Sequence, residues 1–193
     1  MSADSDAARE TLLAELREHA LVIGEVTLSS GQKASYYVDA KRALLLPACF
    51  RALGELVAAE AAERRASAVG GMTIGADPVA CAALAAPGGE GLTAFFVRKE
   101  RKEHGLQRWL EGPVLEAGTR CLVVEDVVTT GGSTVKAIER VREEGCEVAG
   151  VLSVVDRLAG GAEAITEAAD APYRALVSID ELYPERRDRG LTR

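Results

Sequence analysis

Several kinds of residue and segment are scarce in this sequence, and each scarcity argues against a class of protein. There are two histidines and four widely spaced cysteines with no Cys-x-x-Cys pair, which argues against a structural zinc site. No apolar run is long enough to span a bilayer and no signal peptide is recognisable, so we expect a cytoplasmic location without membrane partners. Acidic residues outnumber basic ones, 30 to 23, and the net charge of −7 argues against a nucleic-acid binder.

The length and hydrophobic content set the size of the fold. With 193 residues, 48% of them hydrophobic, the chain fits one domain with a substantial core. No internal repeat or low-complexity linker divides it. We therefore expect a single domain over 1–193.

The most informative stretch runs from Cys121 to Thr134, Cys-Leu-Val-Val-Glu-Asp-Val-Val-Thr-Thr-Gly-Gly-Ser-Thr. Its apolar start is typical of a strand buried on both faces of a parallel sheet, with Cys121 as a small buried hydrophobe. Glu125 and Asp126 follow at the predicted carboxyl end of that strand. Glycines and hydroxyl residues then lead into a helical pattern, where backbone N–H groups converge on an anion at the helix N-terminus.

The acidic pair and the anion cradle predict different parts of one ligand. Carboxylates repel a phosphate, so Glu125 and Asp126 suit sugar hydroxyls or a hydrated cation beside it. Together with the cradle they describe a site for a ribose 5-phosphate group. The alternative is an ordinary strand–turn–helix with a solvated turn. The loop is neither a Walker A sequence nor Gly-x-Gly-x-x-Gly.

The rest of the chain alternates between helical and strand patterns. We expect helices over 6–19, 47–65, 77–85 and 162–168, and strands over 68–71, 92–97, 147–155 and 173–178. Ser5 or Asp6 is the expected cap of the first helix and Asp77 that of the third, while residues 181–193 read as a charged tail. This order predicts a parallel sheet with helices on both faces. Polar groups follow four strands, after Gly70, Val97, Val124 and Val155, at the edge where such sheets bind ligands.

Two further segments carry polar groups in unusual density. Residues 25–39 read as a small hairpin, either an ordinary exposed one or a lid over a planar polar ligand. Residues 98–112 begin Arg-Lys-Glu-Arg-Lys-Glu-His-Gly, either a solvated charge run or a mobile lid with Gly105 and Gly112 as hinges. Trp109 and Leu110 are expected to be packing anchors.

These motifs together resemble a known family. The apolar pair, acidic pair, threonines, glycines and serine of 123–133 resemble the PRPP-binding motif of type I phosphoribosyltransferases. Leu-Ser-Ser-Gly…Ser-Tyr-Tyr-Val-Asp…Lys and Arg-Lys-Glu-x-Lys-x-His-Gly resemble the hairpin and the flexible catalytic loop of the orotate phosphoribosyltransferases. Two departures stand out: Ser29 lies where some members carry lysine, a charge that Lys41 or Lys33 could supply, and residues 72–79 lack the lysine often found there.

The resemblance implies a fold, a reaction and an assembly. The fold is the α/β type I phosphoribosyltransferase fold, a mostly parallel central sheet flanked by helices, with an N-terminal hood over 1–45 and a flexible catalytic loop over about 98–113. The reaction is transfer of ribose 5-phosphate from PRPP to orotate, giving orotidine 5′-monophosphate and pyrophosphate in de novo pyrimidine synthesis. Mg²⁺ is the implied cofactor, held near Glu125 and Asp126 mainly by PRPP and water, with no dedicated protein ligand. The implied assembly is a homodimer whose catalytic loop reaches the neighbouring site.

The same resemblance implies a role for particular residues. Arg157 would pair with the orotate carboxylate, and Thr129 would also touch the pyrimidine. Lys102 would stabilise the leaving group. The residues implied to be catalytic and to clamp pyrophosphate are Arg98, Lys99, Lys102 and His104. The residues implied to bind the ribose 5-phosphate part of PRPP are Glu125, Asp126, Val127, Val128, Thr129, Thr130, Gly131, Gly132 and Ser133.

Two other interpretations remain open at this point. A phosphoribosyltransferase for adenine, hypoxanthine or uracil could share the cradle, although the hairpin and basic loop favour orotate. A non-catalytic regulator could use the same fold to sense PRPP and bind nucleic acid, which the acidic balance and the intact basic loop oppose.

Overall fold

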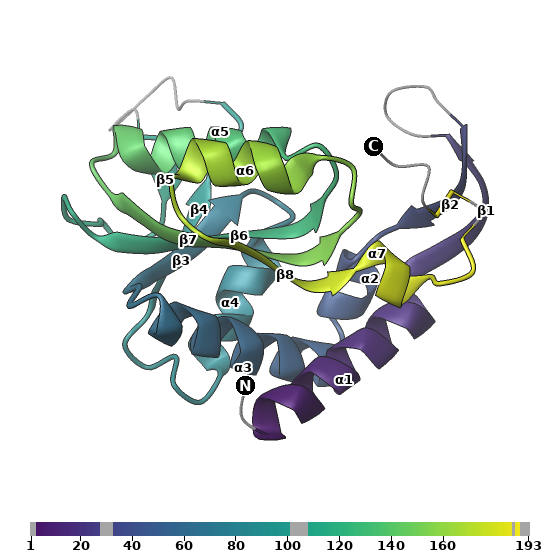
Figure 1. Ribbon diagram of the computed structural model, residues 1–193. Helices are drawn as coiled ribbons and strands as arrows, with labels where there is room; N and C mark the ends of the chain where they lie inside the picture. The colour runs from purple at the N-terminus through teal and green to yellow at the C-terminus, as the bar shows by residue number, and fades with distance from the viewer. Residues whose placement is uncertain (1–2, 28–32, 101–107, 187, 190–193) are drawn as a thin grey trace.

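A twisted sheet lies between two layers of helices in this computed structural model, which describes residues 3–27, 33–100, 108–186 and 188–189 (Figure 1). Within those residues the main sheet has the strand order β5-β4-β3-β6-β7-β8. Its strands are β3 (Ala68–Met72), β4 (Thr93–Val97), β5 (Leu110–Glu111), β6 (Arg120–Val128), β7 (Glu147–Asp156) and β8 (Tyr173–Ser178). Only the β4–β5 pair is antiparallel among these neighbours. The predicted mostly parallel α/β sheet is confirmed.

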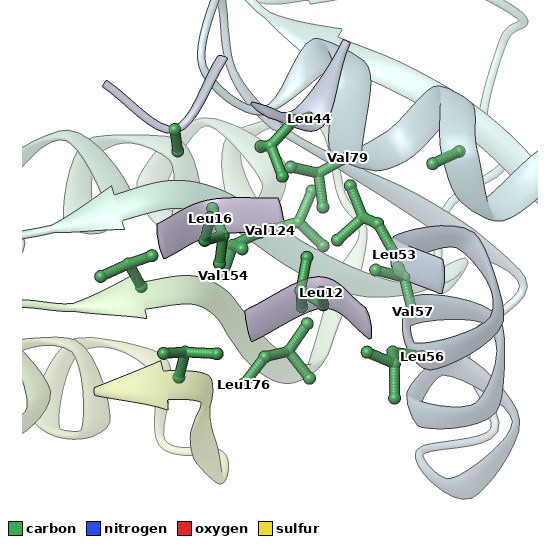
Figure 2. Close-up of a cluster of buried hydrophobic side chains, with 14 of the residues drawn as sticks. Leu12, Leu16, Leu44, Leu53, Leu56, Val57, Val79, Val124, Val154 and Leu176 are labelled. Carbon is green, nitrogen blue, oxygen red and sulfur yellow. The ribbon is translucent and has the colours of Figure 1, made fainter. Parts of the chain in front are cut away.

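Helices cover both faces of the sheet because each parallel connection returns over one face. On one face lie α1 (Ala3–His19), α3 (Pro47–Glu63) and α4 (Asp77–Ala85); on the other lie α5 (Gly132–Glu143) and α6 (Gly161–Ala169) (Figure 1). Figure 2 shows the core on the first face, where aliphatic side chains of α1, α3 and α4 meet those of β6, β7 and β8. Leu12, Leu16 and Leu53 are fully buried there.

A smaller two-stranded sheet stands beside the main one. It consists of β1 (Leu21–Thr27) and β2 (Lys33–Val38), paired antiparallel as predicted, and short helix α2 (Lys41–Leu44) follows it. Helix α7 (Ile179–Leu182) and the residues after it return to this side of the molecule (Figure 1). The hairpin's connection, including Ser29, lies outside the described residues.

Several predicted boundaries were wrong. Helix α1 begins at Ala3, so Ser5 and Asp6 lie inside its first turn and do not cap it. Helix α4 has Ala76 at its N-cap, and the carboxylate of Asp77 instead accepts a hydrogen bond from the Thr73 hydroxyl at 2.7 Å. The expected charged tail begins inside α7, which Ser178 caps in a reciprocal capping box with Glu181.

Two more differences concern the site. Strand β6 continues to Val128, so the acidic pair lies within the strand and does not follow it. Part of the expected mobile loop is ordered structure, because β5 pairs with β4. Within the described residues, none of the helices has the length and hydrophobicity that a membrane span needs.

Candidate active site

The loop between β6 and α5 forms an anion cradle. Gly131 takes a left-handed conformation with φ 80° at the N-cap of α5, which glycine adopts without a steric penalty. Thr130, Gly132 and Ser133 are exposed. The first N–H groups of a helix have no partner within the helix, so those of α5 point toward this open side. The cradle therefore offers backbone donors and a positive helix end to an anion.

Glu125 ties the strand to this cradle. Its Oε2 accepts hydrogen bonds from Ser133 Oγ at 2.8 Å and Thr134 Oγ1 at 3.1 Å, and the side chain is almost fully buried. Burial raises the pKa of Glu125 to about 7, and the charge of Asp126 adds to the effect, while the two hydroxyls oppose it. The carboxyl group is thus poised between its protonated and ionised forms near neutral pH.

Asp126 faces the opposite side of the sheet, toward the hairpin. Successive residues of a strand alternate between faces, and Asp126 Oδ2 lies 2.9 Å from Lys41 Nζ, which is also 3.4 Å from Asp39. Burial alone would lower the pKa of Lys41, but the hydrogen bond and charge of Asp126, with Asp39, raise it overall. The ion pair joins the segment after the hairpin to the central strand.

The loop after β3 lies against Asp126. Pairing between β3 and β6 ends at Gly70 and Val123, although both strands continue beyond these residues. The loop after β3 then approaches Asp126 closely, because a Cβ added at Gly75 would stand 2.4 Å from Asp126 Oδ1. The loop after β3, the acidic pair and Lys41 therefore meet at the carboxyl edge of the sheet.

Arg157 lies after β7, beside the hairpin. Its backbone N–H donates to the Val128 carbonyl at 2.9 Å, and its guanidinium carbon lies 5.5 Å from the centre of the Tyr36 ring. Its Nε is buried and has no hydrogen-bond partner among the described residues. Tyr36 in turn packs edge-on against Tyr183, with ring centroids 5.4 Å apart. The guanidinium thus lies beside an aromatic ring, and its Nε–H remains available to donate to a ligand.

The basic loop is only partly described. The Arg98 guanidinium pairs with Glu111 at 2.9 Å, and Lys99 is exposed. Lys102, His104 and Gly105 fall outside the described residues. Gly112 has φ 120° and approaches β4, since an added Cβ would stand 3.0 Å from the Ala94 carbonyl oxygen.

Trp109 is confirmed as a packing anchor. The centre of its ring lies 3.7 Å from the Arg140 guanidinium carbon, and its backbone N–H donates to the carboxylate of Glu144 at 2.9 Å. Both contacts hold the end of the basic loop against α5.

The predicted residues converge in part. The structure brings together the cradle (129–134), the acidic pair and Arg157 at one edge of the sheet. Val127 and Val128, like the acidic pair, belong to β6. Sequence reasoning placed Asp156 at this edge but missed Ser153 and Tyr173, which form a hydrogen-bonded group with it beside Arg157. Nothing in the local sequence marks Tyr173, because a tyrosine in a strand ordinarily serves packing.

Comparison with known proteins agrees with this arrangement. Residues 73–170 match the phosphoribosyl transferase domain family. The orotate phosphoribosyltransferase of Corynebacterium glutamicum strain R is 49% identical over 175 residues, covering 91% of this chain and 94% of that protein. The one from Streptomyces avermitilis is 50% identical over 179 residues, covering 92% and 98%.

Solved structures show the same relationship in three dimensions. The orotate phosphoribosyltransferase of Mycobacterium tuberculosis in complex with Fe(III) dicitrate has a TM-score of 0.82 and 46% identity, covering 91% of this chain and 99% of that one. Its complex with PRPP has a TM-score of 0.77 and 42% identity, covering 91% and 98%. The chain therefore belongs to the phosphoribosyltransferase family, and within it to the orotate phosphoribosyltransferases.

Proposed function

We propose that this chain transfers ribose 5-phosphate from PRPP to orotate, forming orotidine 5′-monophosphate and pyrophosphate in de novo pyrimidine synthesis, in the cytoplasm. The observation that carries the proposal is the meeting of an anion cradle, an acidic pair and an arginine at one sheet edge, in a chain about half identical to orotate phosphoribosyltransferases over nine-tenths of its length. In this proposal residues 1–193 act as one domain, with 1–45 as the hood.

The cradle holds the 5′-phosphate. Backbone N–H groups at the start of α5, including that of Ser133, and the hydroxyls of Thr129 and Thr130 supply donors to an anion. Gly131 and Gly132 keep side chains out of that space. Because Glu125 already accepts the Ser133 and Thr134 hydroxyls, the loop needs little rearrangement to receive the phosphate.

The acidic pair holds the ribose hydroxyls. Carboxylates accept hydrogen bonds from the 2′- and 3′-hydroxyls, and their negative charge favours the positive charge that grows on the ribose as the anomeric C–O bond breaks. Glu125 reaches the ribose from the α5 side of the sheet and Asp126 from the hairpin side. The Lys41 ion pair fixes the orientation of Asp126.

The base lies toward β7. Arg157 offers a planar fork that pairs with the carboxylate of orotate, and its buried, unpartnered Nε supports a role as donor to a ligand. Tyr36 borders the guanidinium, and Thr129 lies between the base and the phosphate.

The leaving pyrophosphate lies on the other side, toward β3 and β4, where the basic loop begins. Arg98 and Lys99 follow β4, and Lys102 and His104 complete the set of cations that we assign to the leaving group. Among the described residues no cluster of three potential metal ligands occurs. Glu125 and Asp126 offer carboxylate oxygens, and we assign Mg²⁺ a place near them, held largely by PRPP oxygens and water. Bound there, Mg²⁺ would neutralise charge on the pyrophosphate.

The assembly is a homodimer in which the basic loop of one subunit serves the site of its neighbour. We expect Lys102→Ala alone to lower kcat by about two or more orders of magnitude while the fold is retained. Mixing Lys102→Ala subunits with Asp126→Asn subunits should restore activity, since one of the two sites then has both functional groups. A complete lack of recovery in mixed dimers would contradict a shared site.

The reaction itself is tested by the loss of orotate absorbance on adding PRPP and Mg²⁺, with EDTA as the control. Metal-dependent loss supports the proposal. Without loss, protection by PRPP against thermal unfolding would retain the ribose phosphate site and reject orotate as the base. No loss of orotate absorbance together with no thermal protection by PRPP would reject the whole assignment.

A further inference from the structure

A buried polar group lies directly beneath the loop that carries Arg157. The Tyr173 hydroxyl is 2.7 Å from Ser153 Oγ and 3.0 Å from Asp156 Oδ2. Ser153 and Asp156 are almost completely buried in β7, and Tyr173 reaches them from the neighbouring strand β8. Buried polar atoms are costly unless they are paired, and here the pairing fixes the three side chains relative to one another.

The direction of the hydrogen bonds follows from the chemistry of the three side chains. An ionised carboxylate only accepts, so Tyr173 donates to Asp156 and accepts from Ser153. Burial raises the pKa of Tyr173 well above its ordinary value, and the nearby Asp156 carboxylate adds to this. The phenol therefore remains a hydrogen-bond donor at neutral pH.

The second carboxylate oxygen of Asp156 holds the loop. Asp156 Oδ1 accepts the Leu158 N–H at 2.7 Å, and Leu158 adopts φ 55°, a conformation that is unfavourable for a residue with a branched side chain. Between these two residues, Arg157 N–H is bonded to the Val128 carbonyl. The backbone of Arg157 is thus fixed on both sides, and Tyr173 holds the carboxylate that fixes one of them.

The loop ends where α6 begins, and there the chain packs against the anion cradle. A Cβ added at Gly161 would stand 2.5 Å from Val128 Cγ1, 2.7 Å from the Thr129 carbonyl oxygen and 3.0 Å from Gly131 N. These contacts do not involve Tyr173 or Asp156, so the cradle is held separately from the Arg157 end of the loop.

We propose that Tyr173 is a positioning residue that, through Asp156, holds Arg157 at the carboxylate end of the base. The inference rests on the proposed function, because it assigns the carboxylate of orotate and of its product to Arg157. Tyr173 touches no substrate. Tyr173 increases the difference in affinity between bases with and without the carboxylate, and it leaves the phosphate and ribose contacts unchanged.

The test compares two nucleotides that differ only in that carboxylate. Isothermal titration calorimetry gives the Kd of orotidine 5′-monophosphate and of uridine 5′-monophosphate for wild type and Tyr173→Phe. We expect Tyr173→Phe to weaken orotidine monophosphate binding about tenfold, the value of one charge-assisted hydrogen bond. The Kd of uridine monophosphate should stay within about twofold of wild type.

The matched control is Ser153→Ala, which removes a hydroxyl from the same group and leaves the Tyr173–Asp156 bond in place. It should retain wild-type discrimination between the two nucleotides. Equal weakening of both nucleotides in Tyr173→Phe, or the same selective loss in Ser153→Ala, would overturn the positioning role. Should Tyr173→Phe fold poorly, Asp156→Asn provides the same selective loss as a second measurement.

One outcome separates this inference from the proposed function. If the wild-type chain binds both nucleotides equally, the assignment of the carboxylate to Arg157 fails, and the inference fails with it. If wild type discriminates and Tyr173→Phe discriminates equally well, only the inference is overturned.

Discussion

Replacing Glu125 with glutamine should stabilise the folded chain at alkaline pH and weaken substrate binding. Glutamine has nearly the same shape, and its carbonyl oxygen can still accept the Ser133 and Thr134 hydroxyls. What it removes is a buried charge, whose desolvation raises the pKa of Glu125 from the ordinary value of 4.5 to about 7. The substitution therefore separates the stability of the site from its function.

The magnitude follows from the displaced pKa. Below pH 4.5 Glu125 is protonated in both the folded and the unfolded chain, so it has no effect on stability. As pH rises from 4.5 to 7 the unfolded chain loses the proton first, so the folded state becomes progressively less stable relative to the unfolded state. A tenfold change in an ionisation constant corresponds to about 1.4 kcal/mol, which gives roughly 3 kcal/mol at pH 8.5 and below about 1 kcal/mol at pH 5.

Urea denaturation at pH 5 and pH 8.5, at one protein concentration, measures this difference. Glu125→Gln should gain roughly 2–3 kcal/mol over wild type at pH 8.5 and little at pH 5. Glu139→Gln, the same chemical change on the exposed face of α5, is the control and should show no pH-dependent gain. A gain of equal size at both pH values, or a loss at pH 8.5, would refute the reasoning that an ionised Glu125 destabilises the fold.

Two further substitutions test the contacts around the acidic pair and the cradle. Lys41→Met removes the partner 2.9 Å from the buried Asp126 and should lower the free energy of unfolding by about 1–3 kcal/mol in urea denaturation. The control is Lys33→Met, which removes an exposed salt bridge and should cost below about 1 kcal/mol. Equal losses would contradict the role of the Lys41–Asp126 pair. Gly131→Ala places a Cβ 3.0 Å from the backbone of α6 at φ 80°, and PRPP titration should show at least about a tenfold loss of affinity. Gly160→Ala has a similar φ of 84° with open space around it, so it should bind PRPP nearly as wild type does, and matching losses would refute the steric argument.

The stretch from β6 to α5 was the most predictable part of the chain. Its apolar run, acidic pair and glycine–hydroxyl loop are local in sequence, and each has a local physical meaning: burial, charge and a helix N-terminus. The structure confirmed the strand and the helix and placed Gly131 in the left-handed conformation at the N-cap. The carboxyl end of the strand was wrong by four residues, because pairing with β7 continues through Val128.

Element boundaries at helix starts were harder to predict. Ser5, Asp6 and Asp77 all have suitable capping side chains, yet none caps a helix. Asp77 is instead engaged with Thr73 four residues earlier. Capping propensity indicates which side chains can cap a helix. Whether such a side chain caps or bonds another group depends on where the helix begins and on the path of the preceding loop.

The sequence by itself determined the alternation of strands and helices, the anion cradle and the family resemblance, because these depend on side-chain periodicity and on residues that are adjacent in the chain. Only the tertiary structure decided that Glu125 and Asp126 serve opposite faces of β6, that Lys41 closes on Asp126 across 85 residues, and that Tyr173 reaches Asp156 from β8. These contacts join residues distant in sequence, and their energy depends on distance and burial, which strand register and crossover connections set.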